Sequence, residues 1–235
     1  MRSAVSAAVL LAGLLAFGGG LGAQTTDLLL VLAADVSRSI DESEFALQRK
    51  GYSAALTDPR VLAAIRGGTT GTIAICFVEW SGAGEQNVVA DWTVIRDEED
   101  AGGLAAAILA APRSFIGRTS ISGAIDFAME RFTAAQPRAS RHIIDISGDG
   151  SNSNGRSVIR ARDEAVAADV NINGLPILAW EPYLDQYYKA NVIGGPGAFM
   201  IVATDFNTFA DAILKKMITE IAMNVRPRPT RIGKR

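Results

Sequence analysis

Short apolar runs alternate with helical patterns along most of this chain, and that alternation limits the fold more than any other feature. Buried strands are expected at LLLVLAA (28–34), GTIAICFVEW (71–80), RHIIDIS (141–147), VNINGLPIL (170–178) and AFMIVA (198–203). Strands separated by helices indicate parallel βαβ units with right-handed crossovers. Strands that are apolar at nearly every position are covered on both faces of the sheet.

One further predicted strand, VVADWTVI at 88–95, departs from this parallel pattern. It alternates apolar and other residues and follows the glycine-containing SGAGEQN, so we expect it to pair antiparallel with the strand before it. Helices are expected at 41–58, 99–111, 122–135, 157–169 and 205–223. The sequence therefore predicts one α/β domain with a doubly wound, mostly parallel six-stranded sheet, one antiparallel edge strand and helices on both faces.

The two ends of the chain differ in composition from this domain. Residues 1–23 hold one arginine, then an apolar run and then small residues ending at Ala23, which is the layout of a signal peptide. The apolar run, 4–17, is short for a membrane span of about 20 residues. The last ten residues, 226–235, hold five basic residues and predict a disordered tail. We therefore expect a domain at 24–225 of an exported protein, periplasmic or secreted, with no stable membrane insertion after cleavage.

Charge and cysteine content exclude some classes of protein. Cleavage would remove Arg2 and leave 22 basic against 25 acidic residues; without the five bases of the tail the body carries 17 against 25, a net charge of −8. Such a body argues against nucleic acid as a partner. The single cysteine, Cys76, cannot form an internal disulfide and is expected to be a buried thiol.

Oxygen-bearing side chains follow the first predicted strand at alternate positions, as Asp35, Ser37 and Ser39. An extended backbone turns every second side chain to the same side, and ligand sites of open α/β sheets lie at the carboxyl ends of strands. Thr119 lies in GRTSISG before a predicted helix, and Asp149 follows the HIIDIS strand. Hydroxyls and carboxylates without imidazole or thiolate suit a hard cation, Mg²⁺ first, with Mn²⁺ or Ca²⁺ as alternatives.

Each of these residues also has an interpretation without a metal. Ser39 and Glu42 form the S-x-x-E pattern of a capping box, which would begin a helix at residue 40. Asp149 lies between Gly148 and Gly150 and fits a turn. The joint placement of the oxygen donors at strand ends favours the metal site.

The segments LLLVLAADVSRSI, GRTSISGAIDFA and HIIDISGDGSN resemble the three loops of the metal-ion-dependent adhesion site of von Willebrand factor type A domains. The resemblance covers about residues 27–222 and implies a Rossmann-like fold of that family, in an exported bacterial branch without an assigned function. One departure is SGDG, which replaces the more usual Thr-Asp-Gly around the last aspartate.

The resemblance also implies roles for individual side chains. Ser37 and Ser39 would coordinate the ion directly, and Thr119 directly or through a water molecule. Asp35 and Asp149 would act mainly through waters and by orienting the hydroxyls. An acidic group of a partner would complete the coordination.

Aromatic and acidic side chains follow two strands near the same edge. Trp80 with Glu79, and Trp180 with Glu181, are candidates for a partner-binding surface, since aromatic residues are enriched in binding hot spots. A core position is the alternative for each tryptophan. The single histidine, His142, begins a strand at the opposite end, so we do not expect it to be catalytic.

These features together predict a non-catalytic, divalent-metal-dependent module that binds a protein or peptide through an exposed acidic residue. The chain carries no G-x-S-x-G, P-loop or H-E-x-x-H motif. A metal-dependent hydrolase of phosphatase type, using the same oxygen-rich site, is the alternative. A structural domain with a vestigial site is the third interpretation.

Overall fold

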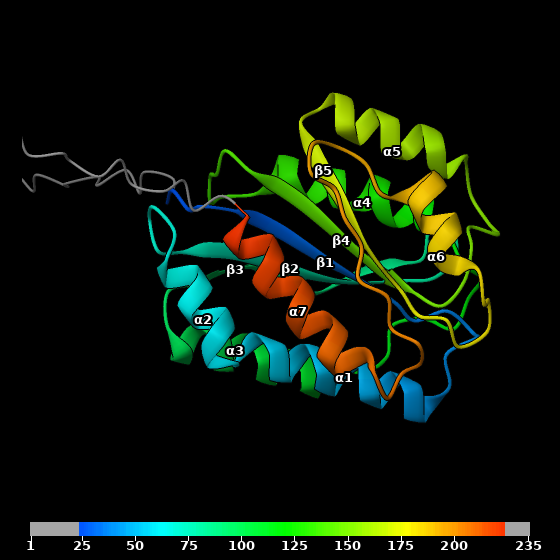
Figure 1. The fold of residues 1–235 in the computed structure, drawn as a ribbon, viewed down its shortest axis with the longest axis horizontal. Helices are drawn as coiled ribbons and strands as arrows, with labels where there is room; N and C mark the ends of the chain where they lie inside the picture. Colours follow the sequence, from blue (N-terminus) through cyan, green and yellow to red (C-terminus); the bar gives the residue numbers. More distant parts are fainter. Residues whose placement is uncertain (1–23, 224–235) are drawn as a thin grey trace, which may run out of the picture.

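A five-stranded sheet with helices on both faces forms the protein in a computed structural model that describes residues 24–223 (Figure 1). The predicted signal peptide and basic tail lie outside the described residues. Strand order is β3-β2-β1-β4-β5, and β3 is the antiparallel edge strand. The strands are β1 (Leu29–Asp35), β2 (Ile73–Trp80), β3 (Gln86–Ile95), β4 (His142–Gly148) and β5 (Val170–Pro176). The predicted α/β class is confirmed.

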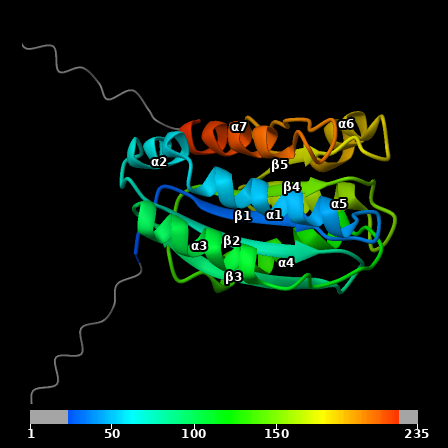
Figure 2. The ribbon, with the colours of Figure 1, turned by 90° about the horizontal axis from the view of Figure 1, so that it is seen from below.

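Helices cover the sheet in two groups, one on each face. The elements are α1 (Glu42–Leu56), α2 (Pro59–Arg66), α3 (Glu98–Ala110), α4 (Ile121–Ala134), α5 (Val158–Ala167), α6 (Leu184–Tyr187), the π-helix η1 (Tyr188–Val192) and α7 (Phe209–Ala222). Helices α1, α2, α3 and α7 share one core cluster with the sheet, and α4, α5 and η1 share the other. Helix α7 packs against α1 and α2 (Figure 2).

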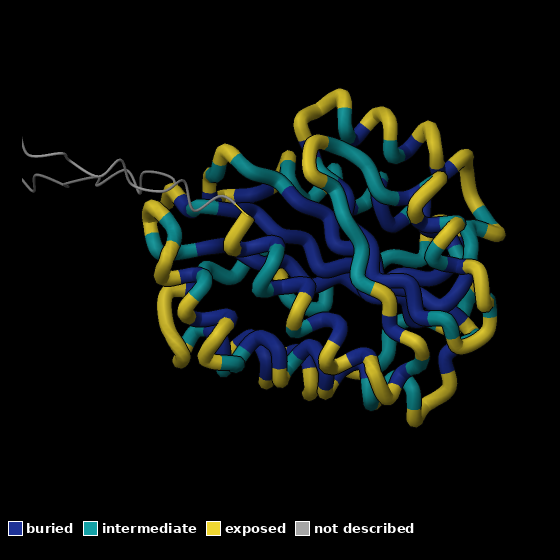
Figure 3. Tube along the Cα trace, in the orientation of Figure 1, coloured by how far each residue is buried: buried dark blue, intermediate teal, exposed yellow. Residues whose placement is uncertain are grey.

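The central strands are apolar on both sides, which is why they read as continuous apolar runs. Leu30 and Leu32 of β1 pack in the first core cluster, whereas Val31 and Ala33 pack in the second. Figure 3 shows these strands as a buried interior surrounded by exposed outer surfaces. Cys76 of β2 is buried as predicted, and burial raises the pKa of its thiol to about 12, so the thiol is unreactive.

The sixth predicted strand, 198–203, does not form a regular ladder. It makes isolated parallel bridges, Met200 with Gly174 and Ala203 with Ile177. The N–H groups of Ile201 and Ala203 donate to the carbonyls of Gly174 and Pro176 in β5, but Pro176 has no N–H with which to donate a bond in return. A proline in the β5 sequence therefore reduces the sheet from the expected six strands to five.

The segment 59–66 forms a helix that the apolar pattern did not predict. Asp58 caps it by accepting a 2.8 Å hydrogen bond from the Arg60 N–H, and Pro59 occupies the first helical position, where a missing N–H has no cost. The Asp-Pro pair was the available sequence signal. Among residues 24–223, no helix combines the length and apolarity that crossing a bilayer requires.

Candidate metal centre

Three loops at the carboxyl edge of the sheet bring the five predicted oxygen donors together. Because β1 and β4 are parallel neighbours, Asp35 at the end of β1 lies beside Asp149, which directly follows β4. Ser39 Oγ donates to Asp149 Oδ1 at 2.7 Å, and the Oγ atoms of Ser37 and Ser39 are 3.2 Å apart. Thr119, two residues before the start of α4, has its Oγ1 3.5 Å from Ser37 Oγ. The sequence-predicted set is therefore one cluster in space.

Helix α1 begins in a way that leaves Ser39 free for this cluster. Its N-cap is Asp41, whose carboxylate accepts the Glu44 N–H while the Glu44 carboxylate accepts the Asp41 N–H, each at 2.9 Å. The capping box predicted for Ser39 and Glu42 is thus two residues further along the chain. As a consequence, the Ser39 hydroxyl is directed to Asp149 instead of to the helix backbone.

The two carboxylates of the cluster are buried with no counter-charge. Asp35 Oδ1 accepts the Ser37 N–H at 2.7 Å, but Asp35 Oδ2 and Asp149 Oδ2 have no hydrogen-bond partner in the described part of the chain. Neither group forms an ion pair with any residue in the range 24–223. Burial, and then the charge of Asp149, raise the pKa of Asp35; burial is also the main cause that raises the pKa of Asp149 to about 6. A cation between them would relieve this unfavourable arrangement.

The donor set fits a small divalent cation with oxygen ligands. Adjacent ligands of an octahedral Mg²⁺ at about 2.1 Å are about 3 Å from each other, close to the 3.2 Å between the Ser37 and Ser39 hydroxyls. No group of three His, Cys, Asp or Glu side chains among the described residues has metal-binding geometry, so an ion here would depend on hydroxyl ligands. Neutral ligands leave such an ion much of its positive charge.

Arg113 holds the 36–40 loop in place, a role that sequence reasoning missed. Its Nη2 donates to the carbonyl oxygens of Val36, Ser37 and Ile40 at 2.9, 2.9 and 2.8 Å. Arg113 lies in the irregular segment between α3 and α4 and belongs to no motif, so no signal in the sequence connects it with this loop.

Tyr188 and Gly148 explain the departure from the usual Thr-Asp-Gly pattern. Tyr188 of η1 is fully buried, and its hydroxyl has no hydrogen-bond partner among the described residues. A Cβ atom at position 148 would lie 2.9 Å from Asp35 Oδ2 and 3.0 Å from Tyr188 Oη. The glycine therefore provides the space that the tyrosine hydroxyl and the aspartate carboxylate share.

A surface cavity of about 230 Å³ opens beside the cluster, and the predicted residues Trp180 and Glu181 line it. Trp180 is 66% exposed. The carboxylate of Glu181 accepts hydrogen bonds from the N–H and the hydroxyl of Ser151, at 3.0 and 2.6 Å. Arg38 and Arg118, which the sequence interpretation did not single out, also line the cavity.

Glu79 and Trp80 do not belong to this surface, which corrects the sequence-based prediction for that pair. Strand β2 lies between β3 and β1 with both faces covered, and both side chains are fully buried. Glu79 forms an ion pair with Arg49 and accepts the Ser114 N–H at 2.9 Å. It anchors the segment that carries Arg113 and supports the site only indirectly.

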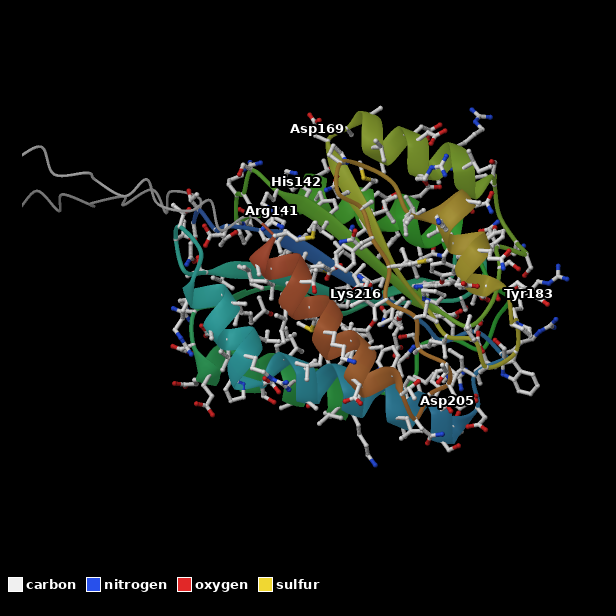
Figure 4. All side chains as sticks on the ribbon, in the orientation of Figure 1. Arg141, His142, Asp169, Tyr183, Asp205 and Lys216 are labelled. Carbon is white, nitrogen blue, oxygen red and sulfur yellow. The ribbon has the colours of Figure 1, made fainter. Side chains whose placement is uncertain are left out.

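His142 lies at the opposite end of the sheet from the cluster, as predicted. Figure 4 shows it far from Tyr183, which is three residues from Trp180. Its ring packs edge-on against Phe132 with 5.2 Å between centroids. Partial burial lowers the pKa of His142.

A family model described as "Protein of unknown function (DUF1194)" matches residues 25–225. The chain belongs to the DUF1194 family. No curated protein matches this DUF1194 chain. The family description assigns no activity, so function has to be argued from the site.

Solved structures show which fold the DUF1194 domain has. A von Willebrand factor type A protein from Catenulispora acidiphila aligns with a TM-score of 0.60 at 17% identity over 83% of this chain and 43% of that chain. Proximal thread matrix protein 1 of the mussel byssus, with a zinc-occupied MIDAS motif, aligns with a TM-score of 0.60 at 14% identity over 84% and 46%. The pilus adhesin SpaC from Lactobacillus rhamnosus GG aligns with a TM-score of 0.60 at 12% identity over 85% and 31%.

The DUF1194 chain thus spans less than half the length of each of these three structures. At such low identities the likeness concerns the fold alone. The resemblance to von Willebrand factor type A domains, read from the three loop segments, is confirmed at that level.

Proposed function

We propose that this DUF1194 protein is a divalent-metal-dependent binding module, in which Ser37, Ser39 and Thr119 hold the ion. Asp35 and Asp149 orient the hydroxyls and balance the charge from the outer shell. The observation that carries the proposal is the cluster itself: two buried carboxylates, each with an oxygen that has no partner among the described residues, lie among three hydroxyls. Two of these hydroxyls, those of Ser39 and Thr119, line a surface cavity. Mg²⁺ is the first candidate ion, with Mn²⁺ or Ca²⁺ as alternatives.

When bound, the ion supplies a positively charged coordination position for an acidic group of a protein or peptide. The chain's own residues fix that position. Arg113 holds the loop that carries Ser37, and the hydrogen bond from Ser39 to Asp149 joins the loop to the end of β4. Because the hydroxyl ligands are neutral, the ion keeps the charge that attracts the partner.

We further propose that the module works outside the cytoplasm and that its action is binding without turnover. The signal-peptide pattern of residues 1–23 supports export. Two proteins of similar fold, a pilus adhesin and a byssal thread protein, carry names that refer to extracellular assembly.

Calorimetric titration of the purified 24–235 protein with Mg²⁺, Mn²⁺ and Ca²⁺ tests the site. We expect saturable binding that Ser37→Ala and Asp35→Ala weaken by about 10- to 100-fold, the usual effect of losing a ligand or the partner that orients it. Ser140→Ala is the matched control, because Ser140 is exposed and lies two residues before His142, at the end of β4 opposite the cluster. No uptake at millimolar ion would favour a vestigial site.

Partner binding needs a second measurement. Immobilised protein should retain envelope proteins in Mg²⁺, release them in EDTA and fail to retain them after Asp35→Ala. Retention that does not depend on Mg²⁺, EDTA or the Asp35→Ala substitution would contradict the proposal. Turnover of a phosphoester by the Mg²⁺-loaded protein would favour the hydrolase alternative instead.

A further inference from the structure

Two arginines flank the candidate ion position and remain without an ionic partner. Arg38 lies between Ser37 and Ser39 in the chain, and Arg118 directly precedes Thr119. Both are exposed and line the 230 Å³ cavity, and neither takes part in an ion pair within residues 24–223. The Arg38 N–H donates to the Gly117 carbonyl at 2.9 Å, so the two loops that carry these cations are joined.

The acidic residues of the same cavity accept hydrogen bonds from neutral groups only. Glu181 uses both oxygens to accept hydrogen bonds from Ser151, and Asp149 accepts the Ser39 hydroxyl. In the cavity lining, the two arginines therefore balance the charges of Asp149 and Glu181. A divalent cation at the proposed site would make the cavity net positive, on a body whose predicted net charge is −8.

Trp180 adds an apolar surface to this cavity. It is 66% exposed, which is unusual for a side chain of its size, and it lines the cavity together with the two arginines. Tyr183, three residues further on, is 73% exposed. Exposed aromatic residues beside guanidinium groups are typical of surfaces that bind peptides.

We propose that the cavity recognises a peptide segment with two acidic residues, the first on the ion and the second on Arg38 and Arg118, with Trp180 covering the residue between them. This rests on the metal-dependent binding proposed above and adds the partner's composition. In an extended segment, residues i and i+2 lie on the same side about 6.6 Å apart, so two acids separated by one residue both face the cavity. Guanidinium groups suit this role because they bind carboxylates through two parallel hydrogen bonds.

The test compares two synthetic peptides on the 24–235 protein. One is a blocked heptapeptide of glycine with one aspartate, and the other has two aspartates separated by one glycine. Dissociation constants come from NMR titration in Mg²⁺, followed at the Trp180 indole N–H. We expect the two-acid peptide to bind about fivefold more tightly, the scale of an exposed ion pair, and the ratio to shrink at high salt.

Arg38→Gln and Arg118→Gln should each reduce this ratio toward one while leaving Mg²⁺ affinity, measured without peptide, within about twofold. Arg66→Gln is the matched control: Arg66 is exposed, has no ion pair among the described residues and ends α2. The control should keep the ratio of the unmodified protein.

The failures of the two proposals are distinguishable. Equal affinity of the two peptides, with Mg²⁺ dependence retained, overturns the two-acid proposal and leaves the metal-dependent module intact. A two-acid advantage that survives both arginine substitutions also overturns it. If neither peptide binds, or if binding is the same in Mg²⁺ and in EDTA, the result counts against both the metal-dependent module and the two-acid proposal.

Discussion

Two buried acidic clusters lie close together, one at Asp145 within β4 and one at Asp149 directly after it, and only the first contains a cation. In the first, Asp145 and Glu220 share the ammonium of Lys216; the Lys216 Nζ to Asp145 Oδ1 distance is 2.7 Å, and all three side chains are fully buried between α7 and the sheet. In the second, Asp35 and Asp149 have no cationic partner among the described residues, and Asp149 lines the surface cavity. Figure 4 shows Lys216 in the interior, between α7 and the sheet.

The difference separates a structural cluster from a candidate binding site. Where the fold supplies its own cation, the charges are sealed, and Asn173 adds a 2.9 Å hydrogen bond to Glu220. Where it supplies none, free carboxylate oxygens remain beside a cavity. The fold places the ammonium group of Lys216 beside Asp145 and no described cation beside Asp149, which supports the proposal that a cation from solution binds at the second position.

Among these predictions, removal of the Lys216 ammonium group should change the stability of the protein most. Lys216→Met leaves Asp145 and Glu220 buried without a counter-charge, and we expect the free energy of unfolding to fall by about 3–5 kcal/mol. Urea denaturation measures it. Lys215→Met, at the exposed neighbouring position, should change stability by less than about 0.5 kcal/mol. Similar losses in both variants would mean that the buried cluster has no special role.

Removal of a carboxylate from the other cluster should have opposite effects with and without metal. Asp149→Asn should weaken Mg²⁺ binding by about 10- to 100-fold, seen as loss of the Mg²⁺-dependent rise in melting temperature. Without metal the same variant should be at least as stable as the unmodified protein, since one unpaired buried charge is gone. Asp163→Asn, on the exposed surface of α5, is the control. A large loss of stability in EDTA would show that Asp149 is structural.

Filling the space between Asp35 and Tyr188 should disturb the candidate site. In Gly148→Ala the new Cβ meets Asp35 Oδ2 and Tyr188 Oη at 2.9 and 3.0 Å, and we expect about 1–2 kcal/mol of destabilisation together with weaker Mg²⁺ binding. Gly102→Ala, in helix α3 with open space at its Cβ, should instead be stabilising by about 0.5–1 kcal/mol. Thermal melts of both variants test the comparison.

Protonation of Asp149 should give the smallest change in stability. The pKa of Asp149 is about 6 in the folded protein, above the ordinary value of 3.8, so the folded state binds more protons between these values and its stability rises as pH falls through this range. Between pH 7 and 6 the metal-free protein should gain a few tenths of a kcal/mol relative to Asp149→Asn. Urea midpoints of the two proteins at both pH values measure it. A loss of stability between pH 7 and 6, relative to Asp149→Asn, would contradict the raised pKa of Asp149.

The sequence predicted the sheet and the grouping of the donors because both follow from backbone regularities. Continuous apolar runs gave the strands, and parallel neighbours place Asp35 and Asp149 at one edge. The prediction failed where a single residue changes the pattern. Pro176 interrupts the pairing of 198–203. The Ser39–Glu42 capping box, which was the alternative without a metal, does not form because Asp41 caps α1.

The supporting residues could not be predicted because irregular segments carry them. Arg113 comes from the connection between α3 and α4, and Tyr188 from a π-helix, and neither local sequence has a period or motif. Trp80 was assigned to the rim because it ends a strand; only the strand order, which places β2 inside the sheet, shows that it is core. The positions of such residues depend on tertiary packing and cannot be predicted from the local sequence.

The three hydrogen bonds from Arg113 to backbone carbonyls mean that the 36–40 loop is ordered when the chain folds, before an ion binds. A loop that is fixed by a guanidinium during folding has already lost its conformational freedom before any ion arrives. Ion uptake at this loop would then require little further ordering of the backbone, so most of the entropic cost of shaping the site is met when the chain folds.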